Sequence, residues 1–471
     1  MRFGVADARR RFLRGVGLLA VLLAPLACGL DADREVAERV LERYRRATGA
    51  KPLAASHVIR MRLLPETTGA GTGVAEVAWE LNRFRERISS VGVTTERGIQ
   101  SGKAYFTDED GVTRVGSEPV LRELLTRSYF WRRGWLFADR ERARLSLGPA
   151  DPGSLSVRLL PFGGNPLVLS FSRQDGRLLA VRSPGFDLDF SGDRAFRENP
   201  GRRPPYRAEI AWAGLPTGAI PDASVGGARG RFAPASGVVL FDPTPDGGIA
   251  FPARVNGRPV RLALDARIDG PPAISRAKAE ELGLSVSRDV YGRFLAAGAT
   301  LEAGALSCPG IHVEVIESAP PGTEGIVGGT LFREAIVELD PKARALGLFD
   351  PERWVAPAGF TRILVDDDGN RPVTTLRKKG KTMRLLVGSA TGASDLRIAP
   401  AAAGRLGVAV PGTLADLRWG ILPLAPISAA PEEVDRSDRA EDGRLGFGFL
   451  GRYHAHVDMR HRWIYVREIA P

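Results

Sequence analysis

Residues 248–284 read GIAFPARVNGRPVRLALDARIDGPPAISRAKAEELGL. Two runs of alternating apolar residues flank Asn256 and Gly257. This dipeptide favours a two-residue hairpin turn, because both of its residues tolerate positive φ. The second strand of the hairpin then spans Val260–Leu264 and ends at Asp265. The stretch therefore predicts a hairpin that presents an acidic residue at its end.

A short helix and a glycine-rich turn follow the hairpin. Ser275 is placed to cap the helix, and Gly283 is placed to end it. Residues 324–350, EGIVGGTLFREAIVELDPKARALGLFD, then bring glycines before a β-rich tail. This order of hairpin, aspartate, short helix, glycine turn and closing strands resembles the retropepsin-like aspartic proteases over about residues 239–351. The resemblance implies a β-barrel lobe.

The residues after Asp265 depart from the pattern of that family, which has Asp-Thr-Gly or Asp-Ser-Gly. Two such aspartates, one from each lobe, share a proton and activate one water molecule. Here Ala266 has no hydroxyl group, and Arg267 places a cation beside the acid. If the guanidinium reaches Asp265, it holds the carboxylate ionised and opposes proton sharing. The resemblance implies a catalytic role for Asp265 only if the protein is active.

Residues 361–471 repeat the same order of elements. Lys379 and Gly380 are suited to a hairpin turn, and the strand that follows them reaches Val387. A short helix then ends at Gly407. The chain thus predicts two tandem retropepsin-like lobes, spanning 237–352 and 353–471.

The ends of the two lobes share one spacing. Gly446 and Asp458 lie 118 residues after Gly328 and Asp340, respectively. The number of residues between the glycine and the aspartate is therefore the same in both lobes.

The second lobe has no aspartate at the position that corresponds to Asp265 of the first lobe. The matching position falls among Gly388, Ser389 and Ala390, and the next acid is Asp395, which we interpret as a helix-start residue. Ala390-Thr391-Gly392 resembles the family motif without its acid. The resemblance implies a peptide-binding cleft between the lobes, lined by Ala266, Arg267, Ser389, Ala390, Thr391 and Gly392.

The N-terminus resembles a bacterial export signal. Arg9–Arg14 precede an apolar run over 15–26 that is too short to span a bilayer, as in a twin-arginine signal. Leu26-Ala27-Cys28 resembles the end of a lipobox, which implies lipidation of Cys28 and attachment to the membrane. The alternative is ordinary cleavage near Ala27. Residues 1–27 are therefore predicted to direct the protein to the periplasm or the outer membrane.

Residues 28–212 have a different organisation. Residues 31–50 show the apolar spacing of an amphipathic helix, and alternating segments follow to about Trp212. The pattern resembles the outer-membrane lipoprotein carrier and sorting family, which implies a curved antiparallel half-barrel. Its aromatic residues are candidates for lining a lipid-binding hollow, or else form an ordinary core; they are Tyr129, Phe130, Trp131, Trp135 and Phe137.

Together these segments predict a mainly β (α+β) protein. A stretch rich in proline, glycine and alanine, 213–236, is predicted to link the half-barrel to the lobes. The net charge of +11 is spread along the chain without a basic run interleaved with aromatic residues, so nucleic-acid binding is not predicted. Cys308 is expected to be a small buried residue.

No cofactor is predicted, and no metal site. His454 and His456 share one face of a strand and His461 follows, but no carboxylate or cysteine lies near them at ligand spacing. An acidic turn at Asp366–Asn370 lacks the ligands of an EF-hand and is interpreted as solvated.

Three functions remain open. The first is a non-catalytic envelope protein whose lobes bind a peptide or an envelope protein. The second is an active aspartic peptidase that uses Asp265. The third is a lipid or lipoprotein carrier that acts through the N-terminal half-barrel.

Overall fold

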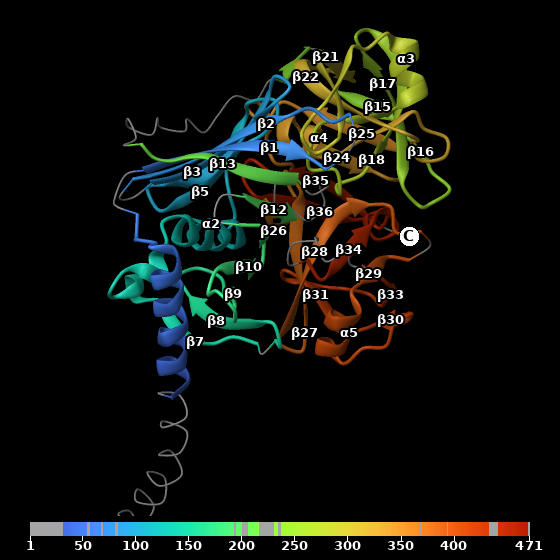
Figure 1. The fold of residues 1–471 in the computed structure, drawn as a ribbon. Helices are drawn as coiled ribbons and strands as arrows, with labels where there is room; N and C mark the ends of the chain where they lie inside the picture. Colours follow the sequence, from blue (N-terminus) through green and yellow to red (C-terminus); the bar gives the residue numbers. More distant parts are fainter. Residues whose placement is uncertain are drawn as a thin grey trace, which may run out of the picture. The chain divides into compact units, whose positions relative to one another are not determined.

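The chain is mainly β, as predicted (Figure 1). Residues 1–27 and Cys28 lie outside the described part of the chain, so the export and lipidation predictions concern residues beyond it. Within the described part, no helix has both the length and the apolar character needed to cross a membrane. The computed structural model describes residues 32–53, 57–66, 69–80, 83–149, 151–192, 195–199, 206–215, 230–233, 237–367, 370–392, 394–432 and 441–469.

The chain divides into two compact units. One combines the residues up to Ala54 with Leu125–Glu198, and the other combines Ala55–Leu124 with Asn199–Pro471. The domain ranges expected from the sequence stay predictions.

The first unit contains a helix over residues 32–48 and an antiparallel meander. The helix buries an apolar side that includes Val40, Leu41 and Tyr44, as its spacing predicts. The strands follow one another in sheet order as β7 (Arg144–Leu147), β8 (Ser154–Leu160), β9 (Leu167–Ser172), β10 (Leu178–Ser183), β11 (Phe186–Phe190) and β12 (Ala195–Asn199).

The aromatic residues of this unit pack against one another. The ring of Phe130 lies 5.0 Å from that of Trp131, 5.4 Å from Trp135 and 5.7 Å from Phe186. Tyr129 is also buried. These rings have the contacts of core aromatics.

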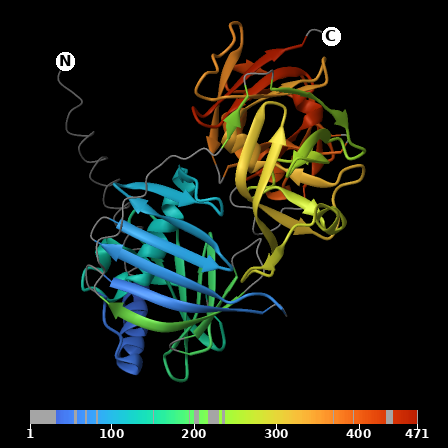
Figure 2. The same cartoon turned by 90° about the horizontal axis from the view of Figure 1, so that it is seen from above.

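The second unit begins with another antiparallel meander, drawn in blue in Figure 2. Its sheet order is β6-β5-β4-β3-β2-β1-β13, and buried and exposed residues alternate along β1 as the sequence predicts. The strands are β1 (His57–Pro65), β2 (Gly73–Glu80), β3 (Arg83–Ser90), β4 (Val93–Gln100), β5 (Lys103–Thr107), β6 (Thr113–Val115) and β13 (Tyr206–Leu215). Helix α2 (Glu118–Trp131) follows β6.

Strands reach into both ends of the predicted linker 213–236. Strand β13 ends at Leu215, and β14 (Arg231–Phe232) pairs with the strand that contains Leu306 and Ser307.

The predicted lobe 1, residues 237–352, has the expected order of elements. Asn256 and Gly257 have φ of 51° and 74°, as their hairpin turn requires. Ser275 caps helix α3, and Gly283 ends it with φ of 67°. The elements are β15 (Val238–Leu240), β16 (Asp242–Pro243), β17 (Ile249–Val255), β18 (Arg258–Leu264), β19 (Ala273–Ser275), α3 (Arg276–Leu282), β20 (Val286–Arg288), β21 (Phe294–Ala303), β22 (Leu306–Ile316), β23 (Gly325–Val327), α4 (Gly329–Glu334), β24 (Ile336–Asp340) and β25 (Ala345–Phe349).

The predicted lobe 2, residues 353–471, repeats much of this order. Its hairpin turns at Lys379 and Gly380, and α5 ends at Gly407. The elements are β26 (Thr361–Asp367), β27 (Pro372–Lys378), β28 (Lys381–Ser389), β29 (Leu396–Ile398), α5 (Pro400–Leu406), β30 (Gly412–Leu414), β31 (Leu417–Trp419), β32 (Leu422–Pro423), β33 (Ile427–Pro431), β34 (Gly443–Gly446), α6 (Phe447–Leu450), β35 (Tyr453–Asp458) and β36 (Trp463–Glu468).

The two lobes share a sheet and a core. Strand β24 of lobe 1 pairs antiparallel with β35 of lobe 2, which continues the order β15-β25-β24-β35-β36-β26. One cluster of buried apolar side chains also extends through both lobes, from Ile249 to Val466. The lobes are therefore joined within one chain by backbone pairing and by apolar packing.

Cys308 is fully buried in lobe 1, as the sequence predicts. Burial, followed by the charge of Glu334, raises the pKa of its thiol to about 12. A neutral thiol packed in this way acts as a small apolar side chain.

Candidate functional site

Asp265 lies at the end of β18, where the backbone is held tightly. Strand β18 runs parallel to β23, and the Asp265 amide donates to the carbonyl of Val327 at 2.9 Å. Gly328 follows, and a Cβ at that position would lie 2.1 Å from the carbonyl oxygen of Asp265. Only glycine allows this approach, so the turn fixes the backbone beneath the carboxylate.

The carboxylate of Asp265 is bound by Arg267. The Nε of Arg267 lies 3.1 Å from Oδ1 and 2.8 Å from Oδ2, and its Nη2 also donates to Oδ2. The backbone amide of Arg267 adds a bond to Oδ1 at 3.0 Å. Both carboxylate oxygens therefore accept charge-assisted hydrogen bonds from Arg267.

This ion pair has one buried and one accessible partner. The side chain of Asp265 is 7% exposed, whereas that of Arg267 is 48% exposed. Burial acts to lower the pKa of the Arg267 guanidinium, but the hydrogen bonds and charge of Asp265 raise it, with smaller contributions from Glu432 and Asp246. Arg267 covers the acid and presents part of its own cation to solvent.

Strand register locates the counterpart of Asp265 in lobe 2. In lobe 1, Leu264 pairs with Val327 just before Asp265. In lobe 2, Val387 pairs with Leu445 in the equivalent parallel pair of strands, β28 and β34. Gly388 and Ser389 follow Val387, and a β-bulge between Val387 and Ser389 leaves Ser389 opposite Gly446, so the counterpart of Asp265 is one of these two residues. The position equivalent to Asp265 therefore carries no acid.

Ala266 follows Asp265 in lobe 1, and Ser389 follows Gly388 in lobe 2. The amide of Ala266 donates to the carbonyl of Gly388 at 2.9 Å, so these two segments meet. Ser389 is fully buried, and its hydroxyl has no hydrogen-bond partner among the described residues. Lobe 1 thus has an acid without a neighbouring hydroxyl group, and lobe 2 has the hydroxyl without an acid.

Thr391 does not occupy the position that the sequence suggested. Its Oγ1 donates to the Ser394 carbonyl at 2.5 Å within a local turn. The resemblance of Ala390-Thr391-Gly392 to the family motif is therefore out of register, because a β-bulge between Val387 and Ser389 shifts the strand.

Gly392 instead contacts a turn of lobe 1. Its amide donates to the Asp246 carbonyl at 2.9 Å. A Cβ at Gly247 would lie 2.3 Å from the Gly392 carbonyl oxygen, so glycine is needed there.

Asp395 does not start a helix, contrary to the prediction. It precedes strand β29, and α5 begins at Pro400 after Ala399. The carboxylate accepts bonds from the Ser428 amide at 2.8 Å and from Arg452 Nη2 at 2.6 Å. The carboxylate of Asp395 is therefore bound by residues from two later segments, Ser428 and Arg452, and does not cap a helix.

The site also has charged neighbours that the sequence did not suggest. Arg444 binds Glu432 through Nε at 2.8 Å and Nη2 at 2.7 Å. Its Nη1 also reaches the carbonyl of Ala390 at 3.5 Å. Glu432 and Asp246 act on Arg267, so acids surround its accessible cation. No local motif marks these residues.

The β20–β21 hairpin of lobe 1 is anchored to the N-terminal meander of the second unit. The Val290 amide donates to Ser90 Oγ at 3.0 Å, and Arg293 Nη1 pairs with Glu109 at 3.0 Å. The turn of this hairpin is buried at Val290 and Tyr291. These contacts join segments about 200 residues apart, so sequence spacing did not reveal them.

No protein-family model matches this chain, and neither does any curated protein. A solved structure of a retropepsin-like aspartic protease from Rickettsia conorii is a structural neighbour of part of the chain. It covers 24% of this chain and 86% of its own, with 18% sequence identity and a TM-score of 0.18. The roles of Asp265 and its neighbours therefore depend on the contacts described above.

Proposed function

We propose that the two lobes form a non-catalytic binding module, which holds a peptide or a segment of an envelope protein without cleaving it. One observation carries the proposal: Arg267 binds both carboxylate oxygens of Asp265, while Gly388 and Ser389, at the equivalent point of lobe 2, carry no acid. Peptide hydrolysis by a shared-proton pair requires two acids. The ion pair and the missing acid both oppose that chemistry.

The surroundings of Arg267 favour binding. Its side chain is half exposed, and Asp246 and Glu432 lie close enough to influence it. A bound peptide meets both a cation and carboxylates here, and backbone groups lie nearby at Gly388 and Gly392. Such a mixture suits the polar backbone and termini of an extended peptide.

The N-terminal sequence supports an envelope location for this module. A signal over residues 1–27 and lipid attachment at Cys28 would hold the protein at the periplasmic face of a membrane. The same proposal includes the nature of the domains. The two lobes are degenerate retropepsin-like lobes, and residues 28–212 form a domain that resembles the lipoprotein carriers. A lipid-carrying role gains no support from the aromatic residues of the first unit, because their rings contact one another.

Substitution of Asp265 by asparagine is expected to leave peptide hydrolysis unchanged at background level, because a partner acid is missing. The measurement is cleavage of an unfolded protein substrate between about pH 3 and 7, with and without pepstatin. Arg267→Gly serves as the matched variant: it frees the carboxylate and is expected to remain inactive. Pepstatin-sensitive cleavage that Asp265→Asn abolishes would contradict the proposal.

Partner binding is expected to occur beside Arg267. A photo-crosslinking residue in place of the exposed Asp246 is expected to form an adduct with a peptide or envelope protein in cells. The same residue in place of Ile421, which is 72% exposed in lobe 2, serves as the control. Equal adducts at both positions, or none at residue 246, would argue against a binding site around Arg267.

A further inference from the structure

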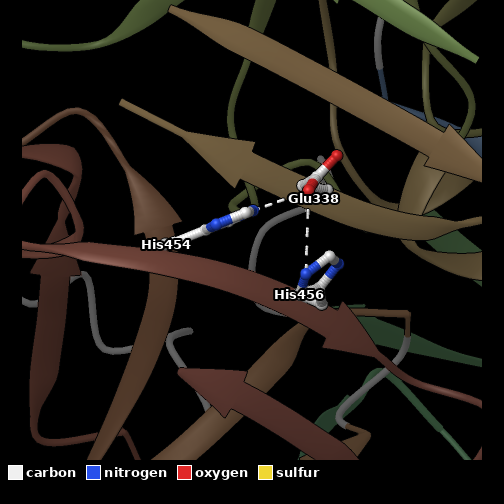
Figure 3. Close-up of side chains that lie close together, drawn as sticks. All are labelled: Glu338, His454 and His456. Atoms are coloured by element: carbon white, nitrogen blue, oxygen red, sulfur yellow. Dashed lines mark hydrogen bonds and ion pairs between the residues drawn. The ribbon is translucent and has the colours of Figure 1, made fainter. Parts of the chain in front are cut away.

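Three side chains with metal-binding groups meet on the sheet that joins the two lobes. Glu338 of β24 lies directly opposite His456 of β35 in the antiparallel pairing. His454 lies two residues along the same strand, so it projects from the same face. Figure 3 shows both imidazole rings directed toward the carboxylate.

The atoms are spaced closely enough to share one ion. His454 Nε2 lies 2.6 Å and His456 Nε2 lies 3.7 Å from Glu338 Oε1. One ligand atom from each residue can be chosen so that all three lie within 4.8 Å of one another. Tetrahedral donors about 2.0–2.2 Å from a zinc ion are about 3.3 Å apart. The His456–Glu338 spacing is close to this value, and the His454–Glu338 contact needs to lengthen by less than about 1 Å.

His456 is suited to act as a ligand. It is buried, and its Nδ1 has no hydrogen-bond partner within the described part of the chain. The buried ring lies with its Nε2 3.7 Å from Glu338 Oε1.

The surrounding residues form a built site. A Cβ at Gly347 would lie 2.3 Å from Glu338 Oε2, so the glycine leaves room for the carboxylate. The ring of Phe360 contacts the rings of His454 at 5.2 Å and His456 at 5.1 Å. Trp354 contacts His456 at 5.4 Å. This apolar wall limits the movement of both imidazoles, as the shell of a metal site does.

Arg467 competes with an ion for this site. Its Nη2 lies 3.4 Å from His454 Nδ1, and a guanidinium can only donate. This contact favours the tautomer in which Nε2 carries the proton and donates to Glu338. Metal binding at Nε2 requires the proton to move to Nδ1, which Arg467 opposes. Arg467 is exposed, and its guanidinium carbon lies 4.8 Å from the centroid of the Phe360 ring.

We propose that Glu338, His454 and His456 bind one divalent transition-metal ion of the zinc class, with water as the fourth ligand. Two imidazoles and one carboxylate form a donor set that zinc accepts. Because Glu338 belongs to lobe 1 and the histidines to lobe 2, the ion joins the lobes across β24 and β35. The site is separate from Asp265, so its test is independent of the proposed binding function.

The test uses the full chain without a polyhistidine tag, stripped with a chelator and titrated with Zn²⁺ by calorimetry. We expect one ion to bind per chain and the melting temperature to rise. Substitutions His454→Gln and Glu338→Gln are each expected to weaken binding by more than the roughly 10- to 100-fold loss seen for outer-shell partners. Arg467→Ala is expected to tighten binding, an effect that general destabilisation of the fold would not produce.

His461→Gln is the matched control. His461 lies on the same segment and pairs with Asp458, but its side chain is 58% exposed and outside the three-residue cluster. Its substitution is expected to leave Zn²⁺ affinity unchanged. The proposal is overturned if the native chain binds no Zn²⁺, or if His454→Gln binds it as tightly as the native chain does.

Discussion

Replacement of Arg333 by methionine is expected to lower the free energy of unfolding by about 3–5 kcal/mol, because it leaves buried carboxylates without their cation. Arg333 lies on α4, and its side chain is 2% exposed. Its Nη1 lies 2.6 Å from Asp108, its Nη2 lies 3.0 Å from Asp110, and its Nε pairs with Glu334. All three acids are buried.

The balance of charges in this cluster explains the size of the effect. Burial acts to lower the pKa of the Arg333 guanidinium, but the charges of Asp108, Glu334 and Asp110 raise it above its ordinary value. The cation is therefore strongly preferred in the folded state. Methionine preserves the apolar stem of the side chain, so the loss reports on the charge and its hydrogen bonds.

Urea unfolding of the native and Arg333→Met chains measures this loss. Arg353→Met is the matched control, because that arginine is 84% exposed and is expected to change stability by less than about 0.5 kcal/mol. The double variant Arg333→Met with Asp108→Asn is expected to recover part of the loss, since it removes one unpaired charge. A loss below about 1 kcal/mol for Arg333→Met would show that water replaces the guanidinium at little cost.

The same cluster ties the N-terminal meander to the candidate site. Asp108 and Asp110 lie in the turn between β5 and β6, whereas Arg333 is next to Phe332 on α4. A Cβ at Gly388 would lie 3.6 Å from the ring of Phe332. Helix α4 therefore contacts the meander through Arg333 and packs beside Gly388 through Phe332.

Local chemistry explains what the sequence could predict. The hairpin turns at Asn256-Gly257 and Lys379-Gly380 follow from residues that accept positive φ. The caps of α3 likewise depend on residues within one helical turn. Each of these features is determined by a few consecutive side chains, so reading the sequence was sufficient.

The ion pair between Asp265 and Arg267 could be anticipated from the sequence for the same reason. The two residues are two positions apart, so the sequence already suggested that the guanidinium could reach the carboxylate. The counterpart of Asp265 was harder to place, because a β-bulge follows Val387. The register between β28 and β34 limits this counterpart to Gly388 and Ser389.

Contacts between distant segments could not be predicted. Glu338 lies 116 residues before His454, and Arg333 lies 225 residues after Asp108. The expectation of no metal site considered ligand spacing along one strand only, whereas the carboxylate that meets these histidines comes from the neighbouring strand. Strand pairing brings such groups together, and no periodicity within a single segment records it.

Substitution of Gly328 by alanine is expected to destabilise the protein by about 1–3 kcal/mol or more, and to displace Asp265. The added Cβ would lie 2.1 Å from the Asp265 carbonyl oxygen and 2.8 Å from that of Ile268. Both contacts involve backbone atoms, so no side chain can rotate away to relieve them. The strand end that carries Asp265 has to move.

Two measurements separate this displacement from simple destabilisation. Urea unfolding gives the loss in stability, and hydrogen exchange reports whether the Ala266 amide still donates to Gly388. Gly404→Ala is the matched control: Gly404 is exposed in α5 with no atom near the new methyl group, so a gain of about 0.5–1 kcal/mol is expected. If Gly328→Ala keeps native stability and Ala266 stays protected, the turn does not position the acid. If protection at Ala266 is lost while distant amides stay protected, Gly328 is what holds Asp265 against lobe 2.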